Sequence, residues 1–242
     1  MRKSSFFGSG NPLMSEKSFS HQSYGSAMTV GGTIAKAAFA LIILAGCAAA
    51  AWTYNLDAVM PFALIGGIIL AIVTIFNKPL APYTVPAYAA LEGIVLGSIS
   101  HMFERSYPGI VNQAVLATFG VLGVMLVLYQ TGLLRPTERF RSVIMAATMG
   151  IGAIYMLNMI MMLFGSSITL IHDISLFGIG FSLFVAVIAA LNLILDFEMI
   201  ETGSRSGAPK YMEWYAAFGL LVTLIWLYLE ILRLISKLQR RK

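Results

Sequence analysis

The sequence has only one cysteine, Cys47, and few charged residues: Asp, Glu, Lys and Arg together make up 11% of its 242 residues. One cysteine excludes an internal disulfide, so cysteine usage does not indicate the redox compartment. Soluble domains usually carry about 25% charged and about 45–50% apolar residues. Here 58% of the residues are hydrophobic and the mean hydropathy is +0.82. This balance excludes an ordinary water-soluble fold.

The motifs of common enzyme classes are missing as well. The three histidines, His21, His101 and His172, lie far apart, and neither HExxH nor a histidine pair at helical spacing occurs. GxSxG, P-loop and GxGxxG patterns are also absent. The net charge of +5 lies in loops and termini, not in a stripe with aromatic residues that would bind nucleic acid. We therefore expect no enzyme, metal site, cofactor or nucleic-acid partner.

What the sequence does have is a series of long apolar runs. A membrane-spanning helix needs about 20 mostly apolar residues, whereas a membrane β-barrel shows alternating segments of about ten. Gly93 and Gly97, in the third run, have the small-xxx-small spacing that lets helices approach closely in lipid. The runs are continuous and predict an all-α integral membrane protein, with seven transmembrane helices at 31–53, 58–77, 84–103, 110–134, 142–164, 174–199 and 213–236.

The loops predict an orientation, because cytoplasmic loops of membrane proteins are enriched in Lys and Arg. With the amino terminus in the cytoplasm, most basic residues of the loops fall on that side, among them Lys78, Arg135 and Lys210. We divide the chain into a cytoplasmic polar tail (1–30), a transmembrane domain (31–236) and a basic tail (237–242). With seven full spans, the basic tail 237–242 lies outside the cell, although Lys and Arg are usually enriched on the cytoplasmic side. The alternative is that the last segment, 213–236, does not cross the membrane fully.

Placing an ionisable side chain inside lipid costs free energy, so residues of this kind are candidates for function. The strongest are Glu92, Asp196 and Glu230. At 1.5 Å per residue, Glu92 lies about 12 Å and Asp196 about 5–8 Å from the inner ends of their helices, whereas Glu230 lies about 25 Å from its inner end. We therefore expect Glu92 and Asp196 to be partners, and Glu230 to pair with Arg233 at i+3 or with water.

Two carboxylates in a poorly hydrated site do not easily both ionise, so such a pair holds a proton near neutral pH. It can therefore sense pH or bind a cation. Calcium prefers several oxygen ligands, and two carboxylates alone would bind it weakly.

Several segments resemble the bacterial branch of the Bax inhibitor 1/YccA-like family of membrane proteins. They are NPLMSEKSF (11–19), MTVGGTIAK (28–36), YAALEGIVLGSIS (88–100), ALNLILDFEMIETG (190–203) and GAPKYMEWYAAFGLLVTLIWLYLEILRLI (207–235). The resemblance covers nearly the whole chain from Asn11. It implies six helices around a central seventh, in a bacterial plasma membrane.

The resemblance also implies a pH-sensitive calcium leak, controlled by acids on helices six and seven and a basic residue at the end of helix two. Asp196 matches the first acid. Aligning the last helix by its Leu-Arg puts Thr223 at the second acidic position, whereas a looser match chooses Glu230, two turns later on the same face. Lys78 occupies the basic position, without the planar fork of an arginine.

Three functions follow as hypotheses. The first is a passive, proton-regulated leak channel for calcium or another cation, motivated by the buried acids. The second is a membrane interaction protein that modulates a membrane protease or another membrane protein through its polar tail, without ion flux. The third, a secondary transporter, ranks last because the two halves of the chain show no convincing internal repeat.

Overall fold

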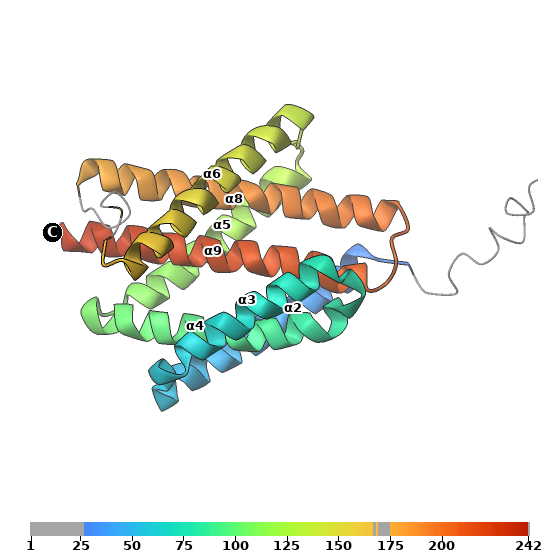
Figure 1. The fold of residues 1–242 in the computed structure, drawn as a ribbon. Helices are drawn as coiled ribbons and strands as arrows, with labels where there is room; N and C mark the ends of the chain where they lie inside the picture. The colour runs from blue at the N-terminus through green and yellow to red at the C-terminus, as the bar shows by residue number, and fades with distance from the viewer. Residues whose placement is uncertain (1–26, 167, 169–174, 242) are drawn as a thin grey trace, which may run out of the picture.

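The computed structural model describes residues 27–166, 168 and 175–241. In this part of the chain the regular structure is helical, apart from one isolated bridge between Ala27 and Pro209. Two short 3-10 turns, η2 (Leu56–Ala58) and η3 (Lys78–Leu80), join helices at opposite ends of the molecule. The α-helices (Figure 1) are α2 (Val30–Tyr54), α3 (Met60–Phe76), α4 (Ala81–Ser106), α5 (Ile110–Gln130), α6 (Glu138–Leu163), α8 (Leu176–Arg205) and α9 (Met212–Arg240).

The prediction of a helical membrane bundle is confirmed. By length and hydropathy, α2, α5, α6, α8 and α9 can each cross a membrane. Helix α3 is apolar but has 17 residues, which gives a length of about 25 Å. Helix α4 has 26 residues and is long enough, but it carries Glu92, His101, Glu104 and Arg105 and is therefore less apolar.

Local sequence chemistry explains where several helices begin and end. The side chains of Thr29, Thr137 and Ser175 accept hydrogen bonds of 3.0–3.2 Å from backbone N–H groups in the first turns of α2, α6 and α8. Asn55 ends α2 in the left-handed conformation, with a φ of 52°. Asparagine is among the few residues with side chains that adopt this conformation readily.

Helix α9 runs through the middle of the bundle (Figure 1) and packs closely against α2, α4, α5 and α8. Helix α3 packs on the outer side of α4, and α6 packs on α8. Helices α2, α4, α6 and α9 begin at one end of the bundle, which we call the basic-loop end because the loops 77–80, 131–137 and 206–211 lie there. Helix α9 spans the bundle, so its carboxyl end lies at the opposite end (Figure 1).

The structure changes two predicted boundaries. Helix α9 ends at Arg240 rather than at residue 236, and Lys237, predicted to begin a basic tail, is buried within it. Its ammonium group donates to the Gly178 carbonyl at 3.0 Å and to the Ser182 hydroxyl at 2.8 Å, both on α8. At the amino terminus, residues 1–26 of the predicted polar tail lie outside the described residues. Met28, at its end, is buried against α8 and α9.

Helices α2 and α4 approach most closely at Gly93 and Gly97, as the small-xxx-small spacing predicts. A Cβ atom at Gly93 would lie 2.8 Å from the Cβ of Cys47, and one at Gly97 would lie 2.8 Å from the Cα of Ala48. Both distances are shorter than real Cβ contacts. Only glycine permits this backbone approach, which gives the close packing that holds helices together in lipid.

We expect Gly97→Ala to lower the free energy of unfolding by about 1–3 kcal/mol, because the new methyl group would push α2 and α4 apart. Unfolding in mixed micelles would measure the change. Gly123→Ala is the matched control: a Cβ there meets no atom within 4 Å, so alanine should stabilise helix α5 by about 0.5–1 kcal/mol. Equal effects at the two positions would contradict the close α2–α4 contact.

Candidate functional site

Asp196 lies on the face of α8 that packs against α9. Opposite it, Gly219 lacks a side chain, and a Cβ there would lie 3.5 Å from the Asp196 Oδ1 atom. The hydroxyl of Thr223, one turn further along α9, lies beside the same carboxyl group. The other carboxyl oxygen, Oδ2, is buried and has no hydrogen-bond partner among the described residues. Asp196 is therefore a half-buried acid at the interface of two helices, and its buried Oδ2 atom has no described donor.

Thr223 occupies the place beside Asp196 at which the family resemblance implies a second acid. Its side chain is 8% exposed, and its hydroxyl donates to the Gly219 carbonyl at 3.2 Å. Of the two positions that the sequence left open, Thr223 and Glu230, the structure brings Thr223 to Asp196. The site thus contains one carboxyl group and the neutral hydroxyl of Thr223.

Glu230 belongs to a separate cluster, where α9 meets α6. The side chain is 1% exposed. It accepts hydrogen bonds of 2.9 and 3.0 Å from Arg233 and one of 2.8 Å from the Tyr155 hydroxyl. The Arg233 guanidinium also donates to the Tyr155 oxygen at 2.6 Å. The structure thus contains the Glu230–Arg233 pair at i+3 that the sequence offered as one alternative.

Glu92 lies elsewhere, and the predicted pairing with Asp196 is wrong. Its carboxylate faces α3, where a Cβ at Gly67 would lie 2.9 Å from the Glu92 Oε1 atom. Helix α4 packs on α2, α3 and α9 but not closely on α8. Helix α9 packs on both α4 and α8 and lies between them. Depth can be estimated from sequence, whereas the neighbours of each helix cannot.

Lys78, the predicted basic latch, lies in η3 at the basic-loop end and is exposed. Its ammonium group lies 5.0 Å from the ring centroid of Tyr215, in the first turns of α9. It forms no ion pair with a described residue within 4 Å. Lys78 therefore contacts α9 through a cation–π interaction, and the structure does not bring it to an acid.

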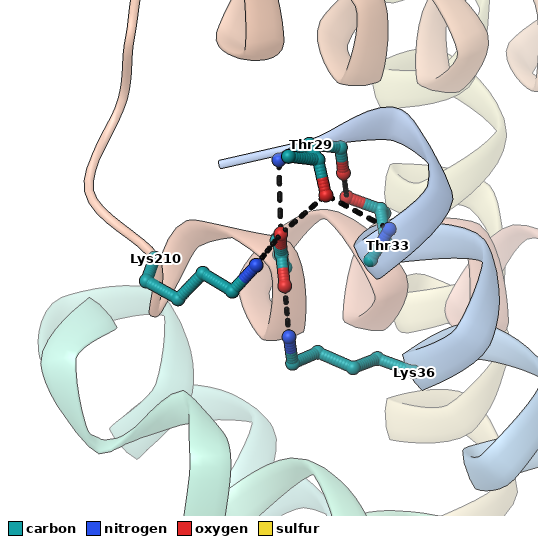
Figure 2. A network of polar contacts seen from close by, with 6 residues as sticks. Thr29, Thr33, Lys36 and Lys210 are labelled. Atoms are coloured by element: carbon teal, nitrogen blue, oxygen red, sulfur yellow. Dashed lines mark hydrogen bonds and ion pairs between the residues drawn. The ribbon is translucent and has the colours of Figure 1, made fainter. Parts of the chain in front are cut away.

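Among the described residues, Glu213 is the acid with the most hydrogen-bond donors, and it was not one of the predicted site residues. Four donor groups converge on its carboxylate from two segments of the chain, residues 29–36 and Lys210, and Figure 2 shows these donors. The backbone N–H and the hydroxyl of Thr29 each donate at 2.9 Å, Lys210 donates at 2.7 Å, and Lys36 forms an ion pair. The Glu213 side chain has 0% exposure.

This cluster fastens the beginning of α2 to the beginning of α9. A Cβ at Gly32 would collide with the Glu213 carboxylate, so the two segments meet directly. The Met28 amide also donates to the Ala208 carbonyl, at 2.7 Å. One signal in the sequence pointed here: Lys210 precedes Glu213 by three residues, a spacing that favours an ion pair. The contribution of Thr29, far away in sequence, carried no such signal.

The described residues contain no group of three or more His, Cys, Asp and Glu side chains that could hold a metal ion. A cation near Asp196 would find one carboxyl group and the Thr223 hydroxyl.

Comparison with known proteins adds one finding. The sequence model of the family described as Bax inhibitor 1 like matches residues 11–240, which is nearly the whole chain. No curated protein shows a significant match to the chain.

Proposed function

The chain belongs to the Bax inhibitor 1 like family, and from this premise we propose that it is a passive, non-enzymatic leak pathway for calcium or another cation, regulated by protonation. One observation supports the proposal most directly: Asp196 has a buried carboxyl oxygen without a described donor, between two membrane helices. An acid inside a membrane protein is expensive and is typical of ion pathways and proton relays. The expected site is a bacterial plasma membrane, with the amino terminus in the cytoplasm.

Asp196 offers a kind of oxygen that hard cations bind. Calcium binds to carboxylate and hydroxyl oxygens, and the Thr223 hydroxyl lies beside the Asp196 carboxyl group. One carboxylate with neutral oxygens binds calcium less tightly than a site with several acids. Weak binding suits a leak, because conduction requires that the ion also leave.

Ionisation of Asp196 would regulate such a pathway. The ionised carboxylate attracts a cation, whereas the protonated group is neutral and leaves the ion without a countercharge in a poorly hydrated region. Because Thr223 replaces the second acid, one proton is enough to neutralise the site. We therefore expect cation flux to be greater at pH 8 than at pH 6, with a single titration step.

The test is calcium flux into liposomes that contain the purified protein. We expect Asp196→Asn to reduce flux at pH 8 by about tenfold or more, since loss of one favourable interaction of about 1.4 kcal/mol gives that factor. The variant should also lose the difference between pH 6 and pH 8. Its matched control is Glu198→Gln, on the same helix, where the carboxylate already pairs with Arg141 at 2.8 Å.

Two results would contradict the proposal. One is an absence of flux in the wild-type protein. The other is the same pH profile in Asp196→Asn as in the wild type. If Glu198→Gln lowered flux as strongly as Asp196→Asn, surface charge rather than Asp196 itself would control the flux.

A second candidate function is the modulation of another membrane protein without ion flux. It draws support from the anchor at Thr29, which fixes the point where the amino-terminal segment joins the bundle. Crosslinking and pull-down would compare the full chain with a variant lacking residues 1–26. An unchanged set of partners would show that the tail is not the contact.

A further inference from the structure

Two clefts lie end to end along the gap between α2 and α5. Each of these helices packs closely on α9, but they do not pack closely on one another. The cleft nearer the basic-loop end has a volume of about 1010 Å³ and also reaches α8. The second has a volume of about 460 Å³ and also reaches α4. Both are lined by Leu41 of α2 and Leu224 of α9, so together they form one groove, which we call the α2–α5 groove.

Most of the groove is apolar, and its α2 side combines alanines with larger apolar residues such as Ile34 and Leu44. Ala45, Ala48 and Ala49 line the second cleft, and Leu224 and Ile225 of α9 line it from the other side. In a membrane this surface does not face water. An acyl chain is an occupant of the right chemistry, because it makes dispersion contacts with such walls and needs no hydrogen bonds.

The mouth of the groove, at the basic-loop end, is polar and contains an arginine that pairs with no described acid. Arg135 lines it, is exposed and forms no ion pair with a described residue. The two acids at the mouth already have partners. Arg141 pairs with Glu198 at 2.8 Å, and Arg205 pairs with Glu201 at 2.6 Å.

We propose that the α2–α5 groove binds an anionic phospholipid of the leaflet at the basic-loop end. Its acyl chain lies along α9, and its phosphate meets Arg135. A guanidinium group forms paired hydrogen bonds with phosphate oxygens. The amide of Gln130 and the hydroxyl of Thr131 line the mouth beside it. The groove has Arg135 at its polar mouth and apolar walls below it. A phospholipid fits this arrangement better than a second helix does, because a helix would carry no phosphate at the level of Arg135.

The experiment measures lipid binding to the purified full-length protein by native mass spectrometry in detergent. Phosphatidylglycerol is compared with phosphatidylcholine of the same acyl chains. We expect the wild type to prefer the anionic lipid, and Arg135→Gln to weaken its binding about fivefold. Arg139→Gln is the matched control, because Arg139 is exposed in the first turn of α6 and does not line the groove.

A second pair of variants tests the apolar part of the α2–α5 groove. Ala38 and Ala35 are both exposed residues of α2, but only Ala38 lines the groove. Ala38→Trp should fill this part of the groove and reduce binding of both lipids, whereas Ala35→Trp should leave binding unchanged.

Three outcomes would overturn the inference. The first is equal binding of the two lipids by the wild type. The second is an equal effect of the substitutions at Arg135 and Arg139. The third is an Ala38→Trp variant that keeps its lipid but loses a crosslinked dimer, which would assign the groove to a second copy of the chain.

Discussion

The Glu213→Ala variant should lose about 3–5 kcal/mol of its free energy of unfolding, measured by denaturation in mixed micelles. Removing one partner of a buried ion pair leaves the other charge without compensation, and losses of this size follow. Here the lost carboxylate has 0% exposure and accepts from the backbone and side chain of Thr29 as well as from two lysines. Lys210 is 45% exposed and can turn to water, but Lys36 is 19% exposed and is more confined.

Glu213→Gln removes the negative charge at this site but keeps the size and shape of the side chain. The amide oxygen can still accept from Thr29, so this variant should lose less stability than Glu213→Ala. Glu138→Gln is the control for charge alone, because the Glu138 side chain is 88% exposed; it should change stability by less than about 0.5 kcal/mol. If Glu213→Ala were as stable as Glu138→Gln, the cluster in Figure 2 would not fasten the chain.

Hydrogen exchange gives a local measure of the same contact. The Thr29 N–H donates to Glu213 and not to water. In Glu213→Ala this amide should exchange faster with solvent, while amides in the middle of α9 keep their protection. A result in which both regions lose protection together would indicate global unfolding rather than release of the amino-terminal segment.

The Glu230→Leu variant should lose about 2–3 kcal/mol of unfolding free energy. The substitution leaves the Arg233 guanidinium and the Tyr155 hydroxyl without their shared acceptor. The expected loss is smaller than at Glu213, because the Arg233 side chain is 32% exposed and can reach water. The stability of Glu230→Leu in the same micelle assay measures it.

A double-mutant cycle supplies the control for Glu230. Replacing both Glu230 and Arg233 with leucine removes the pair together, and apolar replacement of a buried pair is often neutral or stabilising. The double variant should therefore be more stable than Glu230→Leu alone. Additive losses would show that Glu230 and Arg233 do not interact energetically.

The sequence was enough to predict the helices, since each needs only a long apolar run and a local cap or break. It also predicted that the helix with Gly93 and Gly97 approaches another helix closely, because that information lies in their spacing, but not that the partner is α2. Side-chain pairs within one helix could be predicted for the same reason, because their spacing is read directly from the sequence. Glu230 and Arg233, three residues apart, lie on one face wherever the helix is placed.

Contacts between helices could not be predicted in this way. Glu92 and Asp196 have similar predicted depths, but whether they meet depends on which helices are neighbours, and α9 lies between α4 and α8. Glu213 shows the opposite case. Its spacing from Lys210 indicates only that one ion pair, whereas Thr29 and Lys36, distant in sequence, also enclose it. Burial of a charge depends on partners that periodicity does not identify.

Helix α9 is held at both of its ends. Glu213 ties its first turn to the start of α2, and Lys237 ties its last turns to the first turns of α8. A helix attached at both ends cannot slide along its axis or tilt without breaking one of these two sets of contacts. Helix α9 is therefore fixed in position. Any increase in the space around Asp196 requires movement of the helices that pack against α9. Helices α2 and α5 can move apart without breaking close contacts with each other, while α2 stays attached to α9 through Glu213 and to α4 at Gly93 and Gly97.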